Sequence, residues 1–272
     1  MMANEQIQQP DGGNKESGSW FGFRFGERGT HSSRTMMFSE LKELFRGSAT
    51  TTDHAGFRTL IVDDNLLGKK TVATRRLTIQ RLSELYGLHS RIPLFRVFRQ
   101  LWRLDVRGRE MLAFLVAQAR DPLLRRSVEA VLPIPLGSPC RADVIDLYLA
   151  KNLGSRLNPD VRNKVARNVA STLTQAGFLE GRVRKIRSRP EVTPATVTLC
   201  LLLASVQGRR GQRLFTSEVV RLLDRTLSEV TGLARIASKQ GLLSYRQLGS
   251  VVEISFPELL TPLEQEMSDG RV

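Results

Sequence analysis

The residues of this chain whose types and spacing could do chemistry are arginines and lysines. Between positions 141 and 189, eleven basic residues stand against four acidic ones, so less than a fifth of the chain holds half of its net charge of +14. Guanidinium and ammonium groups bind phosphate oxygens and release counterions from nucleic acid. We therefore predict a phosphate-binding surface whose contacts come from Arg162, Lys164, Arg167, Arg182, Arg184, Lys185 and Arg187.

A second basic cluster comes earlier in the chain. We expect Lys69, Lys70, Arg75 and Arg76 to add phosphate contacts to that surface. The run that begins at Gly68 (Gly-Lys-Lys-Thr) resembles the end of a phosphate-binding loop. That motif also needs a glycine five residues before Gly68, where this chain has an aspartate, so we interpret the match as accidental.

No sequence pattern points to catalysis. The histidines are widely spaced, form no HExxH and have no evident companion acid: His31, His54 and His89. The pair Asp63-Asp64 reads as helix-end acids, and no serine stands in a GxSxG elbow. We expect a protein that is not an enzyme and that needs no metal and no cofactor.

The overall composition favours a polyanionic partner. The chain carries 41 Lys and Arg against 27 Asp and Glu, and nucleic acid is the commonest such partner. An anionic membrane surface and a basic surface without function stay as alternatives. Cys140 and Cys200 form no CxxC pair and fit a reducing cytosol. With no secretory signal and an apolar run, 197–206, too short for a bilayer, we expect a cytoplasmic protein that does not enter membranes.

The chain begins with a Gly-rich segment, 1–34, that we expect to be a disordered leader. Its aromatic stretch, 20–25, either stacks on bases or docks on a partner, or is tucked against the core. Residues 35–132 show helical apolar periodicity and predict a bundle of about five or six helices. Thr71, for example, caps a helix that ends at Tyr86-Gly87. Closely spaced prolines at 133–140 indicate a hinge.

After the hinge, one pattern occurs twice. A capped helix ends at a glycine, two apolar residues follow, and one or two short strands come next. This order is typical of the closing part of a winged helix. We predict a first unit over 141–190, a second over 191–258 and a tail over 259–272. The fold class is therefore mainly α, with a helical bundle followed by two winged-helix-like units with short β-hairpins.

Winged helices suit DNA because a helix fits the major groove and a wing lays basic side chains along phosphates. The concentration of charge favours the first unit as the main contact with double-stranded DNA. The second unit is less basic at its strands. It either touches DNA as well or serves packing or dimerisation.

With these elements placed, the chain resembles the BrxA-like proteins of bacterial phage-exclusion (BREX) defence islands. The resemblance rests on the run 64–76 (DNLLGKKTVATRR) in the bundle, and on 161–168 (VRNKVARN) with 176–180 (AGFLE) after the hinge. It implies a small helical accessory protein, similar in its helical part to an antitermination factor, that binds double-stranded DNA without catalysing a reaction. Other defence-system proteins are then further expected partners.

Two other functions stay open. One is an RNA-binding, antitermination-like protein whose helical bundle supplies the binding surface. The other is a scaffold whose winged helices contact proteins while the positive charge serves only solubility. The sequence gives no oligomeric state and no preferred DNA sequence.

Overall fold

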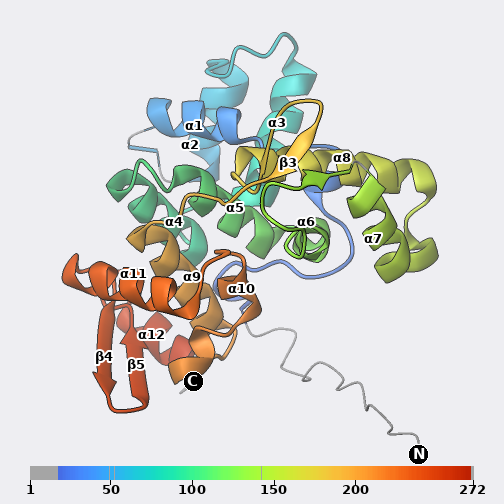
Figure 1. Cartoon of the computed structure of the whole chain (residues 1–272). Coiled ribbons are helices and arrows are strands. Elements are labelled where there is room, and N and C mark those ends of the chain that lie inside the picture. Colours follow the sequence, from blue (N-terminus) through green and yellow to red (C-terminus); the bar gives the residue numbers. More distant parts are fainter. Residues whose placement is uncertain (1–17, 49, 52, 142, 271–272) are drawn as a thin grey trace, which may run out of the picture.

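The computed structural model describes residues 18–48, 50–51, 53–141 and 143–270, and these are mainly helical with two small antiparallel sheets (Figure 1). The predicted fold class is confirmed. The N-terminal part contains a 3-10 turn, η1 (Thr30–Ser32), a π-helical turn, η2 (Thr59–Asp63), and the helices α1 (Phe38–Gly47), α2 (His54–Arg58), α3 (Val72–Tyr86), α4 (Pro93–Leu104), α5 (Arg109–Arg120) and α6 (Pro122–Ser127).

The boundaries of α3 follow from its end residues. The Thr71 side chain accepts a hydrogen bond from the Thr74 N–H, and Gly87 closes the helix in the left-handed conformation. Both ends agree with the sequence prediction, because a hydroxyl cap and a glycine satisfy backbone groups that a helix leaves unpaired.

Two helices are buried on nearly every side. In α5 every residue from Met111 to Arg120 is buried, and in α9 (Pro194–Val206) every residue from Ala195 onward is buried. A helix that is apolar all round belongs in the middle of a core. Since α5 contacts α9 and α9 also contacts α4, the bundle and the C-terminal half share one core.

The predicted disordered leader, 1–34, is wrong for residues 18–34, while 1–17 lie outside the described residues. Phe21 and Phe23 are buried, and the Arg125 guanidinium lies over the rings of Phe23 and Phe25 at 5.8 and 5.4 Å. The aromatic stretch is therefore tucked against the core, where its burial offsets the entropy of ordering a Gly-rich segment.

The first winged-helix-like unit has the full connectivity of that fold. Strand β1 (Pro139–Cys140) precedes helices α7 (Asp143–Leu153) and α8 (Pro159–Gln175), and strands β2 (Leu179–Glu180) and β3 (Lys185–Arg187) follow. The sheet order is β1-β3-β2, with Pro139 opposite Ile186 and Glu180 also opposite Ile186. Helix α6 packs on both α7 and α8.

The predicted hinge, 133–140, is wrong for its last two residues. Pro139 and Cys140 form the edge strand of the first unit, and the Gly137 N–H donates to the Arg187 carbonyl at 2.9 Å. Proline is tolerated here because an edge strand leaves one row of backbone groups unpaired.

The second winged-helix-like unit is built on the central helix α9. It continues through η5 (Gly211–Leu214), α10 (Glu218–Arg221) and α11 (Leu227–Lys239) into the hairpin of β4 (Ser244–Leu248) and β5 (Val251–Ser255). Here η5 contacts β5, so it lies beside the hairpin where β1 stands in the first unit.

The predicted tail, 259–272, contains a packed helix. Leu259 and Leu260 are buried, and α12 (Pro262–Asp269) follows. The Ser268 hydroxyl lies 3.0 Å from that of Ser205 on α9. Along the part of the chain that the structure describes, no helix is both long enough and apolar enough to cross a bilayer.

Candidate nucleic-acid interface

Helix α8 presents one polar, basic face. The Asn158 side chain caps its start by accepting from the Val161 N–H at 2.8 Å, and Pro159 sits in the first turn. Val165, Val169 and Leu173 are buried on the inner side. The outward face carries the exposed side chains of Asn163, Lys164 and Arg167. This is the arrangement that a groove-reading helix needs, with the apolar stripe inward and polar donors outward.

Arg162 does not belong to that outward face, because its guanidinium is paired within the fold; a phosphate contact by Arg162 stays a prediction. Its guanidinium forms a two-pronged ion pair with Asp146 of α7, at 2.9 and 3.2 Å. Only 20% of the Arg162 side chain is exposed. The pair fixes α7 against α8, because a bidentate guanidinium–carboxylate contact restricts both side chains.

The turn between β2 and β3 forms an exposed basic tip. Gly181 has φ +90°, and a Cβ there would lie 2.2 Å from the Arg184 carbonyl, so the turn requires glycine. Arg182 and Arg184 are exposed on either side of Val183. Within the described residues neither arginine has an acidic partner. We call Lys164, Arg167, Arg182 and Arg184 the basic surface of the first unit.

Lys185 and Arg187 follow the tip but differ from it. Lys185 is half-buried, and its ammonium donates to the Gly181 carbonyl at 3.1 Å. Arg187 is buried, lies over the Phe178 ring at 5.7 Å and pairs with Asp224 at 2.8 Å. The prediction that Arg187 contacts phosphate is therefore wrong, because its guanidinium is buried and engaged by Asp224 and the Phe178 ring.

The earlier basic cluster also contains both engaged and exposed cations. Lys69 pairs with Glu40 at 3.0 Å, and Arg75 donates to the carbonyls of Lys69 and Val62. These two residues hold the loop before α3 in place. Lys70 and Arg76 are exposed.

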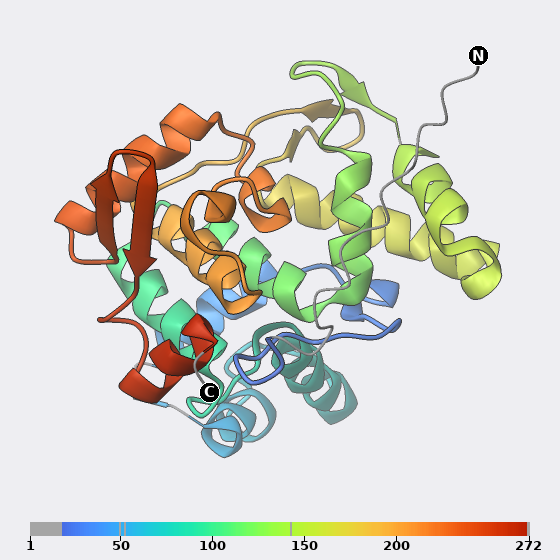
Figure 2. The ribbon, with the colours of Figure 1, turned by 90° about the horizontal axis from the view of Figure 1, so that it is seen from below.

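The structure does not bring this cluster to the basic surface of the first unit. In Figure 2 the yellow helix α8 lies between the β2–β3 hairpin and the teal helix α3. Arg76 instead lines a groove of about 520 Å³ along α3, together with Arg24, Arg58 and Arg120.

A contact that sequence reasoning missed covers one flank of α8. The His31 ring nitrogens lie 2.8 Å from Asp121 Oδ2 and 2.8 Å from Thr172 Oγ1. The Asn168 amide donates to the His31 carbonyl. Asp121 and Thr172 follow His31 by 90 and 141 positions along the chain. No spacing rule in the sequence could therefore have identified them.

The order Asp121–His31–Thr172 is that of a catalytic triad, and the expectation that His31 has no companion acid is wrong. All three side chains are buried, and the Thr172 hydroxyl already accepts the Met36 N–H at 2.9 Å. A nucleophile needs access to a substrate carbonyl. The contact is therefore a tether that holds the segment around η1 on α8.

The tether also perturbs Asp121. Burial by itself would raise the pKa of this carboxyl, but the charge and hydrogen bond of His31 and the N–H groups of Leu124 and His31 lower it below its usual value. Asp121 Oδ1 additionally caps α6 by accepting from Leu123 and Leu124.

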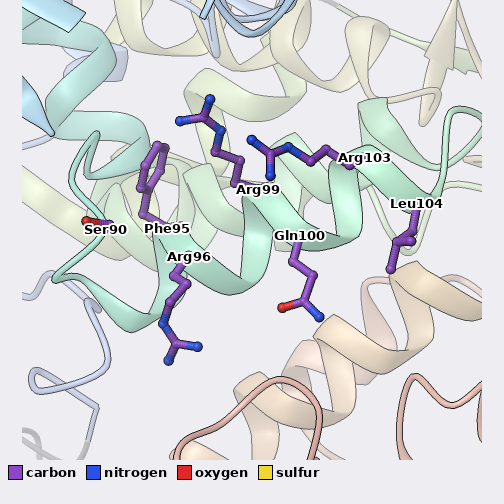
Figure 3. A pocket seen from close by; sticks show the side chains of 7 residues that line it. All are labelled: Ser90, Phe95, Arg96, Arg99, Gln100, Arg103 and Leu104. Atoms are coloured by element: carbon purple, nitrogen blue, oxygen red, sulfur yellow. The ribbon is translucent and has the colours of Figure 1, made fainter. Parts of the chain in front are cut away.

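A pocket of about 420 Å³ lies along α4 (Figure 3). The guanidinium groups of Arg96 and Arg99 point to opposite sides of the helix. Arg96 binds the Leu259 carbonyl and Glu264, and Arg99 binds the carbonyls of Thr51 and Ser48. Both arginines join elements of the fold, so their cations are already engaged.

Fold and surface together define the class: a mainly helical, basic protein with two winged-helix-like units. No protein-family model matches the chain, and no curated protein sequence matches it. Among the described residues, no group of three His, Cys, Asp or Glu side chains lies close enough to hold a metal ion.

Proposed function

We propose that this protein is a non-enzymatic double-stranded-DNA-binding protein and that its first winged-helix-like unit makes the contact. The observation that supports this most is the basic surface of the first unit, where a capped helix and a wing tip expose four cations. In this arrangement α8 enters the major groove with Asn163, Lys164 and Arg167. Arg182 and Arg184 lie along the adjacent phosphates.

A salt titration of binding to a generic duplex tests this function. Each neutralised phosphate steepens the fall of log affinity against log salt by about 0.9. We expect a slope of roughly −3 to −4 for the four cations of the basic surface. Failure to bind duplex DNA even at low salt contradicts the proposal and favours a scaffold that contacts proteins only.

RNA binding by the bundle is the second candidate, and the groove along α3 supports it. The lining of this groove contains cations and apolar side chains together with one acidic residue: Arg24, Arg58, Arg76, Val62, Ile79 and Glu84. Its volume, about 520 Å³, is that of a small-ligand site and suits an unpaired nucleotide better than a duplex. Competition between duplex DNA, duplex RNA and single strands separates the two candidates.

The resemblance to BrxA-like proteins supports a further proposal, that the protein is a cytoplasmic accessory component of an anti-phage defence system with other defence proteins as partners. The test is phage plaque formation on cells that carry such a system with and without this chain. Equal plaque counts contradict the assignment.

A further inference from the structure

The second unit has a groove of its own between α11 and β4. Its lining contains two cations, Arg235 and Lys239, with Ser238, Tyr245, Gln247 and Gly249, and no acidic residue. Arginine, lysine, serine, glutamine and tyrosine are the side chains that bind phosphates and base edges. The composition of this groove is therefore that of a nucleic-acid surface, although the strands of the unit are less basic than those of the first.

The groove is held in shape by contacts between its two sides. The Arg235 guanidinium donates to Gln247 Oε1 at 3.0 Å and lies 5.7 Å from the centre of the Tyr245 ring. The Tyr245 hydroxyl donates to the same Gln247 oxygen at 2.8 Å. These bonds fix the hairpin against α11, so the helix and the wing form one preorganised surface. Preorganisation lowers the cost of ordering side chains on binding.

More cations flank the same hairpin on its other side. The Gln212 amide donates to the Ser250 carbonyl at 2.7 Å, which fixes the loop around η5 beside the turn of the hairpin. Arg209 and Arg213 of this loop are exposed, and within the described residues they have no acidic partner. The hairpin thus lies between two groups of positive charge.

The two units face different directions. In Figure 1 the β2–β3 hairpin lies in the upper middle of the molecule, whereas the β4–β5 hairpin extends downward at the lower left. An ion pair joins the two units: Arg187 of β3 pairs with Asp224, which precedes α11 in the chain. We therefore expect a short, straight duplex bound at the first wing not to contact the second.

We propose that the second unit binds a second DNA duplex through the α11–β4 groove, so that one molecule bridges two DNA segments. The inference rests on the proposed function of the first unit. A DNA-bridging activity follows from this arrangement, because one short, straight duplex does not reach two winged-helix surfaces whose hairpins extend in different directions from a shared core.

A bead assay tests bridging directly. A biotinylated duplex is fixed on beads, and a fluorescent duplex of another length is retained only if protein connects the two. We expect the unaltered protein to retain the fluorescent duplex. The double variant Arg235→Ala/Lys239→Ala should lower retention about tenfold or more while changing affinity for a single duplex about threefold or less, since the first unit is intact.

The control removes two exposed arginines outside both surfaces, Arg107→Ala/Arg221→Ala, and should bridge like the parent. The conservative variant Arg235→Lys keeps the charge and should retain most of the bridging, which separates loss of charge from loss of fold. Bridging by Arg235→Ala/Lys239→Ala at the parent's level overturns the proposal and points to dimers that bind one duplex each. An absence of any duplex binding instead contradicts the proposed function of the first unit.

Discussion

Arg187 and Asp224 join the two winged-helix-like units through an ion pair of 2.8 Å, in which the arginine side chain is 1% exposed and the aspartate side chain 24%. The Arg187 guanidinium also donates to the Phe178 carbonyl and lies over the Phe178 ring. The most buried arginine of the basic segment therefore positions the wing relative to the second unit, and its guanidinium is engaged within the fold.

Arg187→Ala should destabilise the protein by about 3 kcal/mol, because removing one partner of a buried pair leaves the other without compensation. Denaturant unfolding measures this change. The control is Arg189→Ala, an exposed neighbour, whose effect should lie within about 0.5 kcal/mol. Equal stabilities for the two variants contradict a structural role for Arg187.

The quadruple variant Lys164→Ala/Arg167→Ala/Arg182→Ala/Arg184→Ala should bind duplex DNA with a flatter salt dependence. The slope of log affinity against log salt should fall in magnitude by roughly 2 to 4, since each contact contributes about 0.9. The control variant replaces four exposed cations elsewhere by alanine and should leave the slope nearly unchanged: Lys42, Arg46, Arg91 and Arg107. If both variants change it equally, binding depends on net charge and not on this surface.

Arg162→Ala should act on stability more than on the salt slope. Its guanidinium pairs with Asp146 and is only 20% exposed, so the change removes the contact between α7 and α8. We expect a loss of about 1 to 2 kcal/mol and little change in the slope. A slope as flat as that of the quadruple variant means that Arg162 leaves Asp146 to bind phosphate.

Asp121 should make the protein sensitive to acid. Its folded pKa is lowered, so its carboxylate binds protons less readily in the folded than in the unfolded chain. Its contribution to stability is then complete above the unfolded pKa of about 3.9 and is lost as pH falls through the folded value.

Asp121→Asn should cost about 1 to 3 kcal/mol at neutral pH and should reduce the steepness of the loss of stability below about pH 4. Unfolding free energies measured between neutral and acid pH check both effects. An unchanged pH profile in the variant means that Asp121 is not the group responsible.

The two thiols should be nearly inert in the folded protein. Burial raises the pKa of Cys200 well above its ordinary value, and burial raises that of Cys140 although Arg187 and Lys185 oppose the rise. Because the thiolate is the reactive form, an alkylating reagent near pH 8 should label Cys140 slowly and Cys200 more slowly still. Rapid labelling of Cys200 without denaturant contradicts its burial.

The sequence by itself determined the local elements and the region of highest charge. Helical periodicity, the Asn158 and Thr71 caps and the glycine-terminated helices specify α3, α8 and the hairpins, because these features depend on neighbouring residues. The exposure of Lys164, Arg167, Arg182 and Arg184 also follows from helix and turn spacing. The same reasoning could not assign residues whose partners come from other elements.

Only the tertiary structure decided which cations are available. Three of the predicted cations form ion pairs with residues of other elements: Arg162 with Asp146, Arg187 with Asp224, and Lys69 with Glu40. The order of charges along the chain does not show which residues lie close together in space. The leader from residue 18 onward and the end of the hinge were mispredicted for the same reason. Pro and Gly patterns report only the local preference of a segment, whereas contacts with α5 and α8 order residues 18–34 and pairing with β3 orders Pro139–Cys140.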